Sequence, residues 1–149
     1  ISGQLIASDL SYTLGGFAGA IGFDNNVLTL TGWSFANGFD DGLGSWSFAD
    51  NSSAGLLYLE DFADALADEL ILNTNQGMSF VLASFTFKAL TAGQHSLELL
   101  SGLELVSFDN SELDVFDRQS VNINVSQVPE PTTGLLLASC MLLLRRKLS

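Results

Sequence analysis

FVLASFTFKAL, residues Phe80–Leu90, is the stretch that decides the fold. Its apolar side chains recur at every second position: Val81, Ala83, Phe85, Phe87 and Ala89. In the middle of the stretch, the positions between them carry Ser84, Thr86 and Lys88. A period of two is that of a β-strand with one buried and one solvated face. We therefore expect a long amphipathic strand here.

The same period extends from Gly3 to Val125, with glycine-rich turn signals between the segments. Further strands are expected over Gln4–Leu14, Phe17–Phe23, Val27–Phe35, Ser45–Phe48, Gly55–Glu60, Glu69–Leu72, His95–Leu100, Leu103–Phe108 and Val121–Val125. Asp61–Asp68 stays open between an acidic loop and a helical turn that would place Phe62 and Leu66 on one face. About nine short strands without a long helix predict an all-β, antiparallel two-sheet sandwich.

The alternation slips at Gly32. Leu28 and Leu30 are expected to face inward, whereas the bulky residues beyond Gly32 are Trp33 and Phe35, which have the other parity. A glycine at such a slip predicts a β-bulge.

The C-terminal residues 127–149 do not follow this pattern. They begin with a Pro-Glu-Pro step formed by Val128, Pro129, Glu130 and Pro131, and they end with the basic residues Arg145, Arg146 and Lys147. Between these lies an apolar run: Gly134, Leu135, Leu136, Leu137, Ala138, Ser139, Cys140, Met141, Leu142, Leu143 and Leu144. The two prolines favour extended backbone, and basic residues hold a membrane segment's end on the cytoplasmic side.

As a helix, the 11-residue run Gly134–Leu144 would span roughly 16 Å, against a hydrocarbon core of about 30 Å. Residues 128–133 would have to contribute if it crossed a membrane. A C-terminal helix docked on its own domain is the alternative.

The order of these parts resembles the PEP-CTERM sorting signal of Gram-negative bacteria. The resemblance implies export, transient anchoring in the inner membrane, and processing near Pro129–Pro131 by an exosortase, a membrane protease. It also implies delivery to the outer surface or an extracellular polymer matrix. Because the chain starts at Ile1, we expect that a signal peptide has been removed or that this is a fragment.

Residues 1–126 resemble cohesin domains. The likeness rests on Gly16–Phe17 with Ile21–Asp24 and Val27–Leu28, on Leu57–Asp61, on Gly77 leading into Phe80–Leu90, and on Val106–Asn110 with Leu113. Cohesins are nine-stranded jelly-roll sandwiches related in fold to carbohydrate-binding modules. In the best-known systems they bind dockerins in cell-surface assemblies. The resemblance implies the fold, and it specifies no dockerin-contacting surface.

The charge and the cysteine content of the chain exclude some classes of function. Before Arg145 the chain has 17 acidic residues and two basic ones, Lys88 and Arg118, a formal net charge of −15. This excludes binding to nucleic acid through phosphate neutralisation. The single cysteine, Cys140, lies in the apolar tail, so the domain has no disulfide and no cysteine nucleophile.

The sequence contains few combinations of residues that could form a catalytic site. The one histidine, His95, is expected on the solvent side of a strand. Carboxylate pairs are frequent, but a sandwich with short loops offers little cleft for glycoside hydrolysis. We therefore expect no enzyme. Structural calcium is the alternative, because hard oxygen ligands suit it, with Asp40, Asp41, Asp109 and Glu112 as candidates. No other cofactor is indicated.

The tryptophans allow two interpretations. Trp46 alternates with serines and Trp33 lies beside Phe35, so core packing is expected for both. A sugar-stacking platform that includes Tyr12 and Tyr58 is the alternative. The whole chain is then expected to be an exported, non-enzymatic surface or matrix protein that binds a dockerin-like protein or an extracellular polysaccharide.

Overall fold

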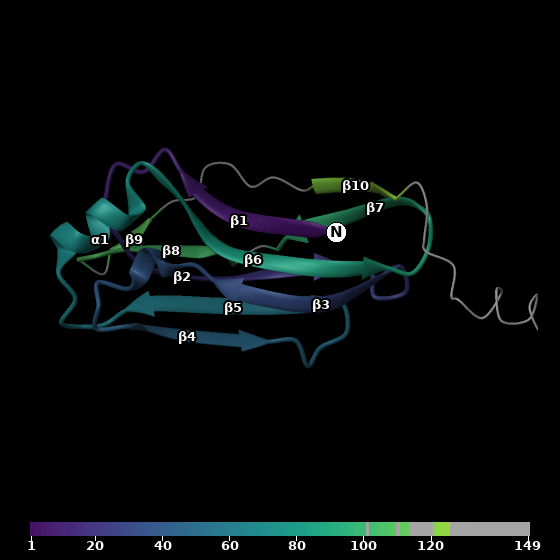
Figure 1. The fold of residues 1–149 in the computed structure, drawn as a ribbon, viewed down its shortest axis with the longest axis horizontal. Coiled ribbons are helices and arrows are strands. Elements are labelled where there is room, and N and C mark those ends of the chain that lie inside the picture. The colour runs from purple at the N-terminus through teal and green to yellow at the C-terminus, as the bar shows by residue number, and fades with distance from the viewer. Residues whose placement is uncertain (101, 110, 114–120, 126–149) are drawn as a thin grey trace, which may run out of the picture.

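β6 (Ser79–Ala89) is the central strand of a three-stranded sheet, as its alternation predicts. This computed structural model describes residues 1–100, 102–109, 111–113 and 121–125. β6 pairs antiparallel with β1 (Ser2–Ser8) on one side and with β3 (Leu28–Phe35) on the other (Figure 1). Its core-facing side chains Phe85 and Phe87 are buried, and Thr86 and Lys88 are exposed.

The second sheet is built around β2 (Leu14–Phe23). Its order is β10 (Val121–Val125), β7 (Gly93–Leu99), β2, β5 (Leu56–Ala63) and β4 (Ser45–Asp50). The first half of β2 also pairs with β8 (Glu104–Ser107), which pairs with the short β9 (Glu112–Leu113). All pairings are antiparallel. The predicted all-β sandwich is confirmed.

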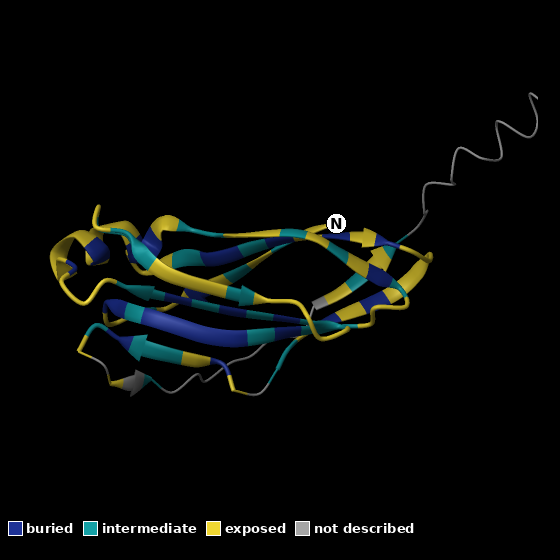
Figure 2. Ribbon diagram, turned by 90° about the horizontal axis from the view of Figure 1, so that it is seen from below, coloured by how far each residue is buried: buried dark blue, intermediate teal, exposed yellow. Residues whose placement is uncertain are grey.

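The core lies between these two layers, where Figure 2 shows the buried residues. The large sheet contributes Phe17, Leu57 and Leu59, which are 0–1% exposed. Leu28 of β3 and the inward residues of β6 cover them from the other side. Burial of this apolar surface is the main force that holds the two sheets together.

The bulge predicted at Gly32 is confirmed. The register between β3 and β6 shifts between Leu30 and Gly32, so Trp33 lies opposite the inward-facing Phe85. The predicted first strand is too long at its C-terminal end. β1 ends at Ser8, Asp9 adopts a positive φ of 56° that turns the chain, and Leu14 begins β2.

The strand predicted at Glu69–Leu72 is wrong, because these residues begin helix α1 (Glu69–Gln76). The carboxylate of Asp68 accepts a hydrogen bond from the Leu70 amide at 2.9 Å and caps the helix. Gly77, with φ of 55°, ends it. Leu72 and Gln76 are four residues apart and form its buried stripe. A 3-10 turn, η1 (Asn37–Phe39), packs against α1.

The predicted sorting motif, the apolar helix over Gly134–Leu144 and the basic cluster lie outside the described residues. Within residues 1–100, 102–109, 111–113 and 121–125, no helix is long and apolar enough to cross a membrane.

Candidate functional site

The large sheet presents a group of aromatic side chains on its outer side. On β4, Trp46 and Phe48 alternate outward and are 59% and 46% exposed. On β5, Phe62 lies directly opposite Trp46, and Tyr58 lies two residues from Glu60, the partner of Phe48. We call the surface formed by Trp46, Phe48, Tyr58, Glu60 and Phe62 the outer aromatic face.

The rings of this face contact one another. The Trp46 and Phe48 rings are nearly parallel, with an interplanar angle of 10° and centroids 6.4 Å apart. Phe62 lies 6.3 Å from Trp46, and Tyr58 meets Phe48 edge-on at 6.4 Å. Such contacts hold the side chains together although solvent reaches them, so the face is preformed.

Small residues on β2 leave room for these rings. Gly16, Ala18, Ala20 and Gly22 lie opposite the outward residues of β5: Phe62, Glu60, Tyr58 and Leu56. A Cβ at Gly16 would lie 2.0 Å from Cδ1 of Phe62. The Phe62 ring therefore lies across Gly16, and it can approach this closely only because glycine has no side chain.

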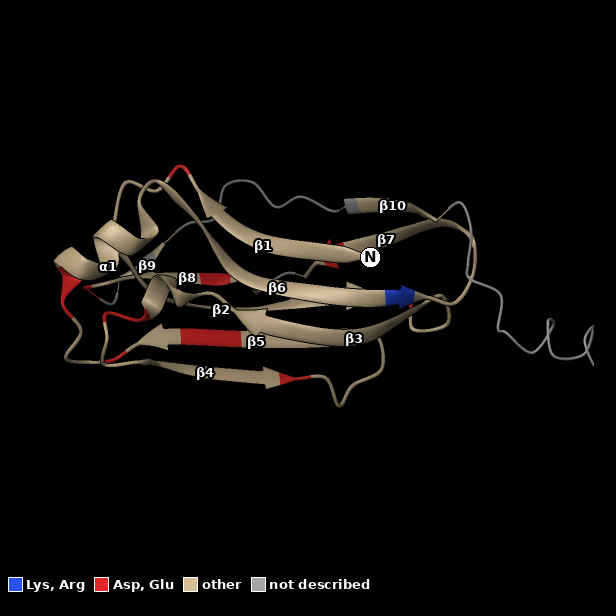
Figure 3. Ribbon diagram, viewed as in Figure 1, with Lys and Arg blue, Asp and Glu red and all other residues tan. Residues whose placement is uncertain are grey.

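The face is acidic. Glu60 accepts a hydrogen bond from the Tyr58 hydroxyl, which raises the pKa of Tyr58 to about 12, with further contributions from desolvation and from the charges of Glu60 and Glu104. Glu104 pairs with Ala18 on the same outer side. Figure 3 shows acidic stretches in β5 and β8, and basic colour at the end of β6 in the other sheet. Of the Lys and Arg residues, only Lys88 falls within the described part of the chain.

The expectation that both tryptophans pack in the core is wrong. Trp46 is 59% exposed, and Trp33, on the edge strand β3, is 40% exposed. On β4 the serines lie on the other side of the strand: Ser45 pairs with Ala63 and is half-buried, and Ser47 pairs with Asp61 and remains exposed at this sheet edge. Alternation of Ser-Trp-Ser-Phe predicts a strand but not which of its faces is buried.

The proposed calcium ligands are engaged in loop hydrogen bonds. Asp40 Oδ1 accepts from the amides of Gly42 and Gly44 at 2.7 and 2.8 Å. Asp41 accepts from Leu43 and Asp68, and these bonds, the one from Asp68 foremost, lower its pKa.

Asp109 accepts from the Ser107 hydroxyl and from Ser111, which lower its pKa, and Glu112 lies in β9 opposite Val106. Within the described ranges, no three or more His, Cys, Asp or Glu side chains gather around a possible metal position. A calcium site on these residues stays a prediction.

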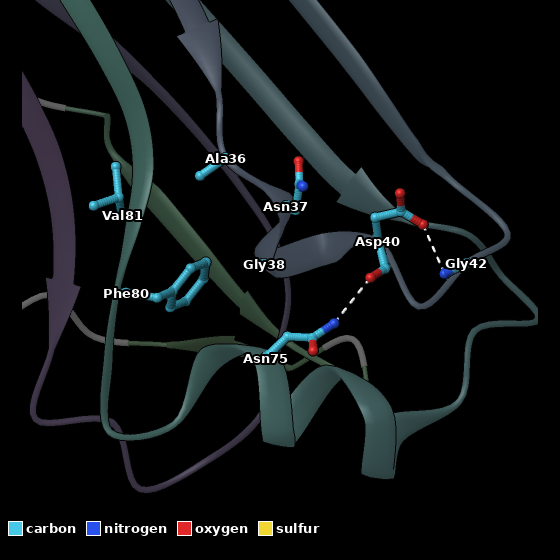
Figure 4. Close-up of a pocket in the computed structure, with 8 residues that line it drawn as sticks. All are labelled: Ala36, Asn37, Gly38, Asp40, Gly42, Asn75, Phe80 and Val81. Atoms are coloured by element: carbon cyan, nitrogen blue, oxygen red, sulfur yellow. Dashed lines mark hydrogen bonds between the residues drawn. The ribbon is translucent and has the colours of Figure 1, made fainter.

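A shallow cleft of about 470 Å³ opens where η1, α1 and the start of β6 meet (Figure 4). It is lined by Ala36, Asn37, Gly38, Asp40, Gly42, Asn75, Phe80 and Val81. The Asn75 amide donates to the Asp40 carbonyl at 3.0 Å, and Asp40 is the one carboxylate in the lining. Apart from Asp40, the lining residues have no titratable side chain.

His95 is not on the solvent side as expected. It is buried on β7, at 8% exposure, and its Nε2 lies 3.0 Å from the Thr91 carbonyl oxygen. The sequence places Asp61 in a run of carboxylates, but it does not predict that this one is buried. Asp61, on β5, faces inward with both carboxylate oxygens buried and without a hydrogen-bond partner.

Solved structures resemble this sandwich closely. The cohesin CaCohA2 of Clostridium acetobutylicum, in complex with CaDoc0917, superposes with a TM-score of 0.69 at 17% identity over 85% of this chain and 89% of its own. This chain has a cohesin fold. A type II cohesin from the cellulosome of Acetivibrio cellulolyticus gives 0.69 at 14% identity, over 87% of this chain and 88% of that one.

The sixth cohesin of scaffoldin B from Acetivibrio cellulolyticus, in complex with a Cel5 dockerin, gives 0.63 at 12% identity, over 85% and 88% of the two chains. No family model and no curated sequence matches this chain. The predicted cohesin-like domain is thus confirmed as a fold.

Proposed function

We propose that this chain is a non-enzymatic protein-interaction module that binds its partner through the outer aromatic face. The observation that carries the proposal is the exposure of Trp46 and Phe48 in contact with Phe62 and Tyr58. Clustered exposed aromatic side chains on a rigid sheet are typical of binding surfaces. Cohesins of similar fold have been solved in complex with dockerins, and this similarity supports a dockerin-like partner.

The charges specify the partner's chemistry. Glu60 and Glu104 flank the rings, and the formal net charge of the whole chain is −12. A partner with apolar side chains surrounded by Lys or Arg would complement this face. Opposite charges around an apolar centre increase the association rate and select the orientation of binding.

The binding experiment uses the full chain immobilised and challenged with a panel of dockerin domains, in surface plasmon resonance. Trp46→Ser and Phe48→Ser are expected to weaken binding at least tenfold, about 1.4 kcal/mol each. Trp33→Ser is the matched control, because Trp33 is an exposed tryptophan on the other sheet. Equal losses in all three variants would contradict the assignment of the face.

We propose further that residues 127–149 are a PEP-CTERM-type signal in a Gram-negative host. An exosortase would cleave near Pro129–Pro131 after transient anchoring in the inner membrane by Gly134–Leu144 and Arg145–Lys147. The domain would then reach the outer surface or extracellular matrix. The intact mass of protein recovered there is expected to lack roughly the last 20 residues. A chain still ending at Ser149 and extractable without detergent would refute this route.

A glycan is the second candidate ligand, and one observation favours it. The Trp46 and Phe48 rings are exposed and within 10° of parallel, which is the arrangement needed to stack on apolar C–H faces of sugars. Tryptophan fluorescence of a Trp33→Phe variant reports Trp46 alone. A saturable change with an extracellular polysaccharide would support this candidate, and silence across a glycan panel would remove it.

A further inference from the structure

The large sheet buries a carboxylate directly behind the outer aromatic face. Asp61 faces inward from β5, opposite Phe17 of β2 on one side and Ser47 of β4 on the other. It is 0% exposed, and neither Oδ1 nor Oδ2 has a hydrogen-bond partner. The hydroxyls of Ser45 and Ser47 are near enough to favour the charged form in part.

The surrounding elements supply no counter-charge within the described residues. β2 and β3 have no titratable side chain. Asp50 lies at the end of β4, where its carboxylate accepts a hydrogen bond from the Ser52 amide at the exposed surface. On β6, Lys88 is exposed on the outer side of the other sheet. The loop before β4 adds Asp40, whose negative charge acts against ionisation of Asp61.

An ionised carboxylate in this position is unfavourable. Burial without a cation or a full set of donors disfavours the charged form far more than the neutral acid. Desolvation accordingly raises the pKa of Asp61 to about 6, against the smaller opposing contributions of the two serines and the Phe62 amide. We therefore expect Asp61 to change its protonation state in a mildly acidic range.

Asp61 pairs with the strand that carries the exposed aromatic residues of the outer aromatic face. Its partner Ser47 lies between Trp46 and Phe48 in sequence, and β4 pairs with β5 alone among the described strands. A strand held on one side by a single neighbour is the part of a sheet that opens most easily.

We propose that Asp61 is a proton-controlled latch: when it is protonated, β4 stays paired with β5, and when it is ionised, β4 loosens at Ser47 and the outer aromatic face is less ordered. The regulatory role rests on the proposed function, because that face is the proposed binding surface. The latch itself requires no partner and can be tested without one.

The test is an NMR titration of the full chain from pH 4 to pH 8. The side-chain carboxyl ¹³C shift of Asp61 reports its protonation. Hydrogen exchange of the β4 amides, corrected for the intrinsic pH dependence of exchange, reports the strand. We expect β4 protection factors to fall by about tenfold or more as Asp61 ionises.

Two variants separate the latch from a general effect of pH. Asp61→Asn keeps the shape without the charge and should make β4 protection independent of pH. Asp64→Asn changes an exposed carboxylate three residues further on and should leave the wild-type response intact.

An Asp61 carboxyl already ionised at pH 4 would overturn the latch, as would wild-type β4 protection that does not change with pH. Protection that depends on added calcium rather than on pH would assign a cation to this carboxylate and also overturn it. Partner binding measured at a fixed pH of 5 tests the proposed function separately, so the two failures are distinguishable.

Discussion

The side chain of Gln76 in α1 completes the hydrogen bonding of Leu14 at the start of β2. Gln76 Oε1 accepts from the Leu14 amide at 2.8 Å, and its Nε2 donates to the Leu14 carbonyl at 2.8 Å. The same Nε2 donates to the Gly38 carbonyl at 3.0 Å. One buried amide thus satisfies both backbone groups of Leu14, two residues before β2 begins to pair with β5 at Gly16.

Replacing this amide should be costly. Gln76→Ala leaves three buried backbone groups without partners, and we expect the free energy of unfolding to fall by about 2–4 kcal/mol. Urea denaturation measures it. Thr74→Ala, on the exposed side of the same helix, should change stability by less than about 0.5 kcal/mol. Equal effects of the two substitutions would mean that the Gln76 bonds do not stabilise the fold.

Gly16→Ala should disturb the outer aromatic face without unfolding the sandwich. The new Cβ would overlap the Phe62 ring, which must move away from β2 and so change its contact with Trp46, on the opposite side of β5. We expect a loss of about 1–2 kcal/mol of stability and an altered near-UV circular dichroism spectrum. Gly22→Ala is the control, because its Cβ would meet only the Leu100 side chain, at 3.1 Å. An unchanged Gly16→Ala spectrum would contradict the close contact.

Stability should depend on pH with opposite signs at the two ends of the acidic range. Because the pKa of Asp61 is raised to about 6, its protonated form stabilises the fold at low pH and this contribution is lost as pH rises through 6. The pKa values of Asp41 and Asp109 are lowered, so their contributions are present above the unfolded pKa and are lost as pH falls through the lowered values.

Together these shifts place the expected maximum of stability near the unfolded pKa of an aspartate, about pH 4. Thermal unfolding followed at half-unit intervals of pH measures it. In Asp61→Asn the decline between about pH 4 and pH 6 should disappear, while the decline at lower pH remains. A wild-type curve that rises steadily to pH 8 would contradict the assignment of Asp61.

Calcium should have little effect on the native domain. Asp40, Asp41 and Asp109 already accept hydrogen bonds from backbone amides of their own loops, which favour the existing conformations. We expect the melting temperature to be the same with calcium and with a chelator. A rise on adding calcium, absent in Asp40→Asn or Asp109→Asn, would instead support a structural site.

The sequence predicted the sheets better than their outer surface. The alternation of Phe80–Leu90 and the slip at Gly32 follow from local periodicity, and both are confirmed. The helix at Glu69–Gln76 was missed because a run of four apolar and acidic residues suits a short strand equally well, although Asp68 and Gly77 are recognisable capping residues.

The outer aromatic face could not be predicted from periodicity alone. In β4 the alternating residues are serine and aromatic, and the usual preference buries the aromatic ones. In β4 the register instead pairs Ser47 with the buried Asp61 of β5 and leaves Trp46 and Phe48 on the outer side. That pairing is a tertiary contact, so local sequence does not contain it.

The central claim is that a protein binds the outer aromatic face, and site-specific photocrosslinking in the native host tests it most directly. A benzoylphenylalanine replaces Phe48 on this face or, as control, Lys88 on the other sheet. The account predicts a discrete protein adduct from position 48 that is absent from position 88 and is abolished by Trp46→Ser. Equal adducts from both positions, or none from position 48 while position 88 reacts, would contradict it.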